Sequence, residues 1–314
     1  MKPAARIMTL LLLLLSGAAL LAVAAGARFP ARDPGPEPIR FLVGMSQATL
    51  VEPWRITMNQ EIEATASEHE DLRVIFTDAA GDSNRQIEDV DRLMGYGVDL
   101  LVISPNESEA LRPAISAAYE KIPVIVLDRD VRGEDYTLFI GPNNHMIGRL
   151  AGEAVGRILA GRGGNVIEIQ GSNDSPPVSA RSEGFAEAIA QYPDIKVIRR
   201  LVADWRQDQA EDRFKEYLVI YDQPIDVVFA QNDAMAYGAY LAAEKLRVTG
   251  IRYVGVDGLQ GARGGVEMVK NGILDATFYC PTGGRQAIEY ALAILSGEEI
   301  GEKRIILDPT EISA

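Results

Sequence analysis

The chain has 314 residues, of which 47% are hydrophobic, and its formal net charge at pH 7 is −14. This hydrophobic content supports buried cores and excludes a largely disordered chain. The acidic balance argues against a nucleic-acid-binding surface, which would be basic. The length suits one large domain or two of ordinary size.

The first 27 residues differ from the rest of the chain. Two basic residues precede a long apolar run at 7–23, and small residues at 22–27 provide cleavage sites. This order is typical of a secretory signal peptide, so we expect export to the periplasm. An uncleaved anchor is the alternative, because the run approaches the length of a membrane span. The Pro-rich segment 28–38 indicates a linker.

From residue 39 onward, short apolar segments alternate with amphipathic ones. We expect strands at 39–45, 72–78, 98–104, 123–128, 137–141, 165–171, 195–202, 225–231, 251–257, 275–280 and 304–308. We expect helices near 54–69, 83–95, 107–120, 143–160, 178–191, 206–220, 233–246, 259–270 and 283–296. Continuous apolar strands that alternate with helices indicate an α/β fold with parallel sheets covered on both faces.

The strand–helix pattern falls into two runs, each of the usual size of one domain. Gly and Pro interrupt the pattern near Ile140 to Asn144, which is where we expect the first run to end. In parallel α/β sheets, ligands bind beyond the carboxyl ends of the strands. The residues that follow the expected strands are therefore the candidates for a binding site.

Acids, arginines, tryptophans and an asparagine follow these strands. The candidates are Trp54, Arg55, Asp128, Arg129, Arg181, Trp205, Asn232 and Asp257. Carboxylates accept hydrogen bonds from hydroxyl groups, arginine and asparagine donate to hydroxyl oxygens, and tryptophan packs on the C–H faces of a sugar ring. The set therefore favours a polyhydroxylated ligand.

Some of these residues have a plain structural interpretation as well. Asp233, which follows Asn232, is as well suited to the N-terminus of a helix as to a ligand contact. Trp205 suits a hydrophobic core, and Asp130 suits a solvated loop. Arg129 directly after a buried strand is harder to explain structurally, which favours a ligand contact there.

Five segments resemble motifs of one known family, in that family's order. They read PVIVLDRDV, VIEIQGSNDSPPVSARSEGF, ADWRQDQA, VFAQNDAMAYGA and VGVDGLQGA. From residue 39 to about 307 the chain resembles the ribose-binding-protein-like type I periplasmic substrate-binding proteins, which are related to the ligand domain of the lactose repressor. The resemblance implies two similar Rossmann-like lobes with parallel sheets, joined by a three-crossover hinge. The implied lobes are 39–142 plus 281–302, and 143–280 plus 303–314.

The resemblance also implies roles for single residues. Ligand-contact positions of the family fall on Asp128, Arg129, Arg181, Asn232 and Asp257, and a stacking aromatic falls on Trp54. A further polar position falls on Cys280, with Tyr279 as the alternative by a shift of one residue. In the segment VEPWR, Glu52 and Arg55 depart from the family's usual tract, which argues against ribose itself.

Other classes of protein lack support in the sequence. The chain has no Gly-x-Ser-x-Gly elbow, Walker sequence or HExxH motif, and it has two histidines, so we expect no enzyme, metal site or cofactor. A transcription regulator would carry a DNA-binding segment at its N-terminus, where this sequence has the pattern of a signal peptide. The acidic net charge also argues against DNA binding. We expect a monomeric protein that captures a monosaccharide or polyol by lobe closure and delivers it to an ABC importer. The alternative is a protein that presents the ligand to a membrane sensor kinase.

Overall fold

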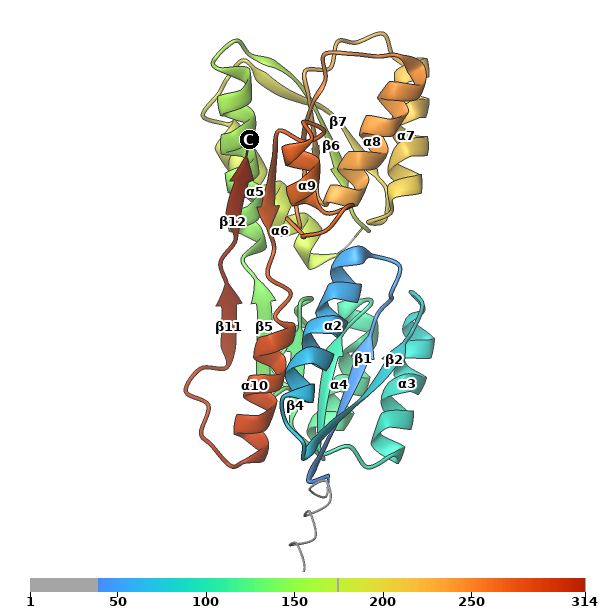
Figure 1. Ribbon diagram of the computed structural model, residues 1–314, viewed down its shortest axis with the longest axis vertical. Coiled ribbons are helices and arrows are strands. Elements are labelled where there is room, and N and C mark those ends of the chain that lie inside the picture. The colour runs from blue at the N-terminus through green and yellow to red at the C-terminus, as the bar shows by residue number, and fades with distance from the viewer. Residues whose placement is uncertain (1–38, 174, 314) are drawn as a thin grey trace, which may run out of the picture. The chain divides into compact units, whose positions relative to one another are not determined.

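The computed structural model describes residues 39–173 and 175–313 (Figure 1). The expected signal peptide at 1–27 and linker at 28–38 lie outside the described residues and stay predictions. Within 39–173 and 175–313, every helix is too short or too polar to cross a bilayer.

The first sheet has six parallel strands in the spatial order β11-β5-β4-β3-β1-β2. Its strands are β1 (Phe41–Gln47), β2 (Leu72–Asp78), β3 (Leu100–Ser104), β4 (Val124–Leu127), β5 (Leu138–Pro142) and β11 (Arg304–Leu307). All six were expected from their apolar runs. The strands are short and mostly buried, as in sheets covered on both faces.

The second sheet also has six strands, in the order β12-β10-β9-β8-β6-β7. Its strands are β6 (Gly164–Gln170), β7 (Ile195–Val202), β8 (Val227–Ala230), β9 (Arg252–Val254), β10 (Ala276–Tyr279) and β12 (Thr310–Ser313). β12 runs antiparallel to β10 at the edge of the sheet and was not expected. Its four residues include one aliphatic side chain, so the sequence carries no strand signal there.

Nine helices are present in the described part of the chain, in the places expected. They are α2 (Pro53–Ser67), α3 (Ser83–Gly95), α4 (Ser108–Tyr119), α5 (Asn144–Leu159), α6 (Pro176–Ile189), α7 (Gln207–Ile220), α8 (Asp233–Leu246), α9 (Gly265–Lys270) and α10 (Gly284–Leu295). α9 begins six residues later than expected. Positive φ angles at Gly258 (58°) and Gly261 (99°) keep the segment before it out of a helix.

Side-chain alternation along each strand divides the core into layers. In β3, Leu100 and Val102 pack in the cluster that contains the inner face of α2 and α10. Leu101 and Ile103 point to the opposite face and pack with α3 and α4. The α/β fold with parallel sheets covered on both faces is therefore confirmed, because successive residues of a strand face opposite layers.

The chain passes between the two sheets three times in the described residues. It crosses after β5 into α5, after β10 into α10, and after β11 into β12 (Figure 1). The expected lobe boundary at residue 303 places β11 with the second sheet, and this is wrong. β11 pairs in parallel with β5, and the amide of Phe139 donates to the carbonyl of Lys303 at 2.9 Å. The chain therefore crosses only after Leu307.

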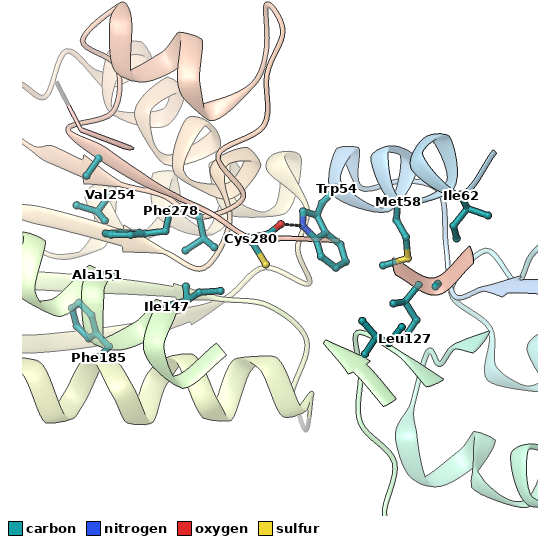
Figure 2. Packing of buried hydrophobic residues seen from close by; sticks show 14 of the residues in the cluster. Trp54, Met58, Ile62, Leu127, Ile147, Ala151, Phe185, Val254, Phe278 and Cys280 are labelled. Atoms are coloured by element: carbon teal, nitrogen blue, oxygen red, sulfur yellow. Dashed lines mark hydrogen bonds between the residues drawn. The ribbon is translucent and has the colours of Figure 1, made fainter. Parts of the chain in front are cut away.

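One apolar cluster continues from the second sheet to the first. In Figure 2, Trp54 of α2 lies beside Cys280, which follows β10, and the Trp54 indole Nε1 donates to the Cys280 carbonyl at 2.8 Å. Phe278 packs on one side of this contact, and Met58 and Leu127 pack on the other. Trp54 and Cys280 therefore join elements of the two sheets directly.

α5 and α6 meet at two glycines. A Cβ on Gly148 would lie 2.0 Å from the carbonyl oxygen of Arg181, and a Cβ on Gly184 would lie 2.0 Å from that of His145. Real Cβ atoms do not approach an oxygen so closely, so the two helices pack backbone to backbone. This contact therefore determines how closely the backbone of Arg181, one of the expected site residues, lies against α5.

We expect Gly148→Ala to destabilise the folded chain by about 1–3 kcal/mol, because the added methyl group must push α6 away. Urea unfolding, read as the midpoint concentration, measures the effect. Gly95→Ala, at the end of α3 with no atom within 4 Å of the added Cβ, is the matched control and should lose no stability. Equal midpoints for the two variants would contradict the backbone-to-backbone packing.

Candidate functional site

Eight of the nine expected site residues line one small cavity. The volume of the cavity open to a water-sized sphere is about 20 Å³, and its lining residues are Glu52, Trp54, Arg55, Asp128, Arg129, Pro177, Arg181, Trp205, Asn232 and Asp257. They come from the ends of strands in both sheets and from the helix starts that follow them. Each of the eight is at least nine-tenths buried. The sequence therefore identified residues that are far apart in the chain but close in space.

Asp128 directly follows β4, and Asp257 comes shortly after β9. Both acids have unusual backbone conformations. Their φ angles are 71° and 118°, a region that residues other than glycine rarely adopt. Neighbouring strands hold both positions, since the Asp128 amide donates to Ile140 at 2.8 Å and the Asp257 amide donates to Phe278 at 3.0 Å. Such strain costs roughly 1–3 kcal/mol per residue and persists where the surroundings enforce it, most often at functional sites.

Most of the N–H groups of Arg55 donate to other side chains of the protein. Its Nε donates to Glu52 at 3.3 Å, and one Nη donates to Asp128 at 2.9 Å. The other Nη donates to Gln47 and to Ser104, each at 2.7 Å. These bonds use four of the five N–H groups of a guanidinium. Arg55 therefore mainly orients the two carboxylates, with one N–H left for a ligand.

Arg129 lies beside Arg55 and is buried. One of its Nη atoms donates to the carbonyl oxygen of Asn106. Burial, and after it the repulsion of Arg55, lowers the pKa of Arg129 to about 10, so the side chain is still charged at neutral pH. Its remaining N–H groups are available on the wall of the cavity.

Arg181 is fixed by partners that carry no charge. Its Nε donates to Asn144 at 2.8 Å, one Nη donates to the carbonyl of Gln231, and the other donates to the sulfur of Cys280 at 3.4 Å. Its guanidinium carbon lies 5.5 Å from the centre of the Trp205 ring. Arg181 therefore keeps its charge close to the cavity without an opposing carboxylate in direct contact.

Cys280 was expected to contact the ligand, and it is not among the lining residues. Its sulfur faces Arg181 and its carbonyl accepts from Trp54. Burial raises the pKa of the thiol to about 12, so it is neutral. The alternative, Tyr279, is 38% exposed and borders a different crevice between α2 and β12. The sequence could not decide between the two, because the direction of a side chain at the end of a strand depends on what packs against it.

Asn232 and Asp233 both act at the start of α8. The Asn232 Oδ1 accepts from the Met235 amide at 2.8 Å, so Asn232 is the N-cap, and its Nδ2 donates to the Trp205 carbonyl at 3.0 Å. Asp233 accepts from the Thr277 hydroxyl at 2.6 Å and from the Gly258 amide at 2.9 Å. Asp233 is not a lining residue, so its structural interpretation is the right one.

Asp233 and Asp257 form a pair of buried acids beside the cavity. Burial raises the pKa of Asp233 to about 7, against the opposing effect of its hydrogen bonds. Burial, and next the charge of Asp233, raises the pKa of Asp257 well above its usual range. No hydrogen bond within the described residues involves the Asp257 carboxylate. A ligand that donates to it would therefore stabilise its charged form.

Glu52 and Pro177 are the two lining residues that the candidate set left out, and Glu52 is the charged one. It stands three residues before Arg55, a spacing that places the two side chains on the same side of a helix start. With Glu52 included, the cavity has three acids and three arginines. The numbers of acidic and basic side chains are equal, and burial favours the neutral form of Asp257 until a donor binds it. Within the described residues, no three acidic, His or Cys side chains come together as metal ligands.

Comparisons with known proteins agree with this geometry. A family model described as "Periplasmic binding protein domain" matches residues 43–299. The chain is 30% identical to the ribose import binding protein RbsB of Salmonella typhimurium, over 82% of this chain and 85% of the relative. It is 29% identical to a xylitol-binding protein of Mycolicibacterium smegmatis, over 69% of this chain and only 61% of that relative.

A solved structure is also similar. The fructose-binding periplasmic domain of a hybrid two-component system matches with a TM-score of 0.82 and 36% identity. The match covers 87% of this chain and 90% of that domain.

The acid pair predicts a pH-dependent stability. An unfolded aspartate releases its proton near pH 3.8, and folded Asp233 releases it near pH 7, so between these values the folded state holds a proton that the unfolded state has lost. The contribution of the pair to stability therefore falls as the pH rises through this window. Asp257→Asn removes one acid and its repulsion of the other.

We expect the stability of Asp257→Asn relative to wild type to rise by about 1 kcal/mol or more between pH 5 and pH 8. Urea unfolding of the ligand-free protein at four pH values measures this difference. Asp212→Asn, at an exposed position of α7, is the control and should follow the wild-type curve. Parallel curves for Asp257→Asn and wild type would show that the two acids do not interact.

Proposed function

The chain belongs to the periplasmic binding protein family, in its ribose-binding-like type I branch, and from this premise we propose that it binds a neutral monosaccharide or a related polyol. The family and these relatives are binding proteins, not enzymes. We propose that the protein works in the periplasm as a monomer and delivers its ligand to an ABC importer.

One observation carries the choice of ligand class. The cavity presents three acids, three arginines and two tryptophans. Carboxylates accept from sugar hydroxyls, guanidinium groups donate to sugar oxygens, and such charge-assisted bonds are about twice as strong as neutral ones. The tryptophans suit the apolar C–H faces of a sugar ring.

The names of the relatives support the same class. They bind ribose, xylitol and fructose by their descriptions, which are polyhydroxylated compounds of five or six carbons without charge. The departure at Glu52 and Arg55 adds a carboxylate and a guanidinium next to Asp128. This extra pair favours a compound other than ribose for the present chain.

Closure of the two sheets on the ligand is the proposed mechanism. Asp128 and Arg129 follow β4 of the first sheet, whereas Asp257 follows β9 of the second sheet and Arg181 lies in α6, which follows β6 of that sheet. A ligand between them therefore binds the closed form better than an open one. Shifting such an equilibrium from mostly open to mostly closed takes about 5.5 kcal/mol of differential affinity. Several charge-assisted hydrogen bonds and a stacking contact can supply this amount. The importer would recognise the closed surface.

A second role uses the same closure. The solved structure with 36% identity is the fructose-binding periplasmic domain of a hybrid two-component system, which favours ligand presentation to a sensor kinase as the second candidate. The cavity chemistry is the same for both roles. The partner protein distinguishes them.

Calorimetry against a panel of ribose, fructose, arabinose, xylitol and myo-inositol should detect binding to the purified chain. We expect Asp128→Ala and Arg181→Ala each to weaken that binding at least about 100-fold, because the first leaves buried Arg55 without its carboxylate and the second removes a buried guanidinium from the cavity wall. Asp212→Ala on the exposed side of α7 should bind as wild type. Heat with an amino acid or an anion, and none with any sugar or polyol, would reject the proposed ligand class.

Deletion of the gene in its own organism should separate the two roles. For the importer role we expect the uptake of the radiolabelled compound found by calorimetry to fall at least about 10-fold and to return on complementation. Normal uptake together with loss of the transcriptional response to that compound would favour the sensor role instead.

A further inference from the structure

The two tryptophans of the cavity differ in whether the indole N–H has a hydrogen-bond partner. The Nε1 of Trp54 donates to the Cys280 carbonyl at 2.8 Å. The Nε1 of Trp205 is buried and has no hydrogen-bond partner among the described residues. Buried tryptophan N–H groups usually have a partner, and a donor left without one is unfavourable. Trp205 is thus an exception on the wall of the binding cavity.

The position of the Trp205 ring is tightly determined. A Cβ on Gly171, the residue after β6, would lie 2.0 Å from Cε2 of the ring, so the ring occupies the space above that glycine. The ring cannot slide toward the β6 end, because backbone atoms lie directly beneath it. Only glycine at 171 permits this close approach.

The backbone of Asp204 and Trp205 is also strained, and hydrogen bonds keep it in this conformation. Asp204 and Trp205 have φ angles of 46° and 66°, which residues with a side chain rarely adopt. The Asn232 side chain donates to the Trp205 carbonyl at 3.0 Å, and the Arg206 amide donates to Ala203 at 2.8 Å. Strain of this kind persists where the surroundings enforce it. The structure maintains an unfavourable turn and a fixed ring whose N–H has no acceptor in the described protein.

On the basis of the proposed sugar-binding function, we propose that the Trp205 N–H donates a hydrogen bond to one oxygen of the bound sugar or polyol, and that Trp205 thereby selects ligands with an oxygen at that position. If residue 205 only stacked on the ligand, phenylalanine, which has no N–H group, would serve equally well. A buried donor that the ligand alone satisfies rejects an analogue lacking the oxygen, because the N–H then stays unpaired. Trp54, with its N–H already bonded, offers the ligand its ring only.

Nuclear magnetic resonance of the indole groups tests the proposal directly. The chain contains two tryptophans, so the ¹⁵N-labelled protein gives two indole signals, which Trp54→Phe and Trp205→Phe assign. The probe is whichever of ribose, fructose, arabinose, xylitol and myo-inositol binds most tightly in calorimetry. At saturation we expect the Trp205 indole proton to move downfield and its exchange with water to slow at least about 10-fold, while the Trp54 proton keeps its bond.

Deoxy analogues of the same probe give a second readout. We expect Trp205→Phe to weaken binding of the parent compound about 10- to 100-fold, and to leave almost unchanged the affinity for the one analogue that lacks the accepted oxygen. Trp54→Phe, the matched control, should weaken parent and analogues by one common factor, since the N–H lost there bonds the Cys280 carbonyl and not the ligand.

Three results would overturn the proposal, and they are distinguishable. If the probe binds but the Trp205 proton neither shifts nor slows its exchange, Trp205 does not donate to the ligand, and the sugar-binding function still stands. If no sugar or polyol of the panel binds, the proposed function fails and this inference fails with it. If Trp205→Phe lowers the affinity for the parent compound and for every deoxy analogue by the same factor, Trp205 only stacks on the ligand, and the proposal is wrong.

Discussion

Six ionisable side chains share one small buried cavity, and the surrounding structure makes their burial tolerable. An isolated buried charge is strongly unfavourable unless it is paired or hydrogen-bonded. Arg55 lies between Glu52 and Asp128 and bonds both carboxylates. Arg129 and Arg181 are held by amide and carbonyl oxygens and by a thiol, so they keep donors for a ligand. The donors and acceptors of these side chains are incompletely paired, which suits a compound rich in hydroxyl groups.

The fold supplies this arrangement through backbone positions that few sequences tolerate. Asp128, Asp257 and Trp205 adopt positive φ angles at the cavity wall, and each is held by hydrogen bonds from neighbouring elements. Gly148 and Gly171 allow the backbone to approach Arg181 and the Trp205 ring to within distances that any Cβ would block. The geometry of the site therefore depends on residues outside the cavity, and local strain is offset by long-range contacts.

Much of the fold was predictable because its strands are continuous apolar runs and its helices are amphipathic. β12 escaped prediction because an edge strand of four residues with one aliphatic side chain has no pattern of its own. Glu52 was noted as a departure from the family tract but not counted as a site residue, since its role appears only through its bond to Arg55. Cys280 was misplaced because the direction of a side chain after the end of a strand depends on what packs against it.

The sequence by itself determined the alternation of strands and helices, the concentration of acids, arginines and tryptophans at strand ends, and the absence of a basic surface, because these are properties of local pattern and composition. Only the tertiary structure decided how the donors and acceptors are distributed. Trp54 bonds a carbonyl 226 positions away, whereas the N–H of Trp205 has no partner among the described residues. Both are tryptophans after strands, and the difference arises from packing between segments that the chain order does not bring together.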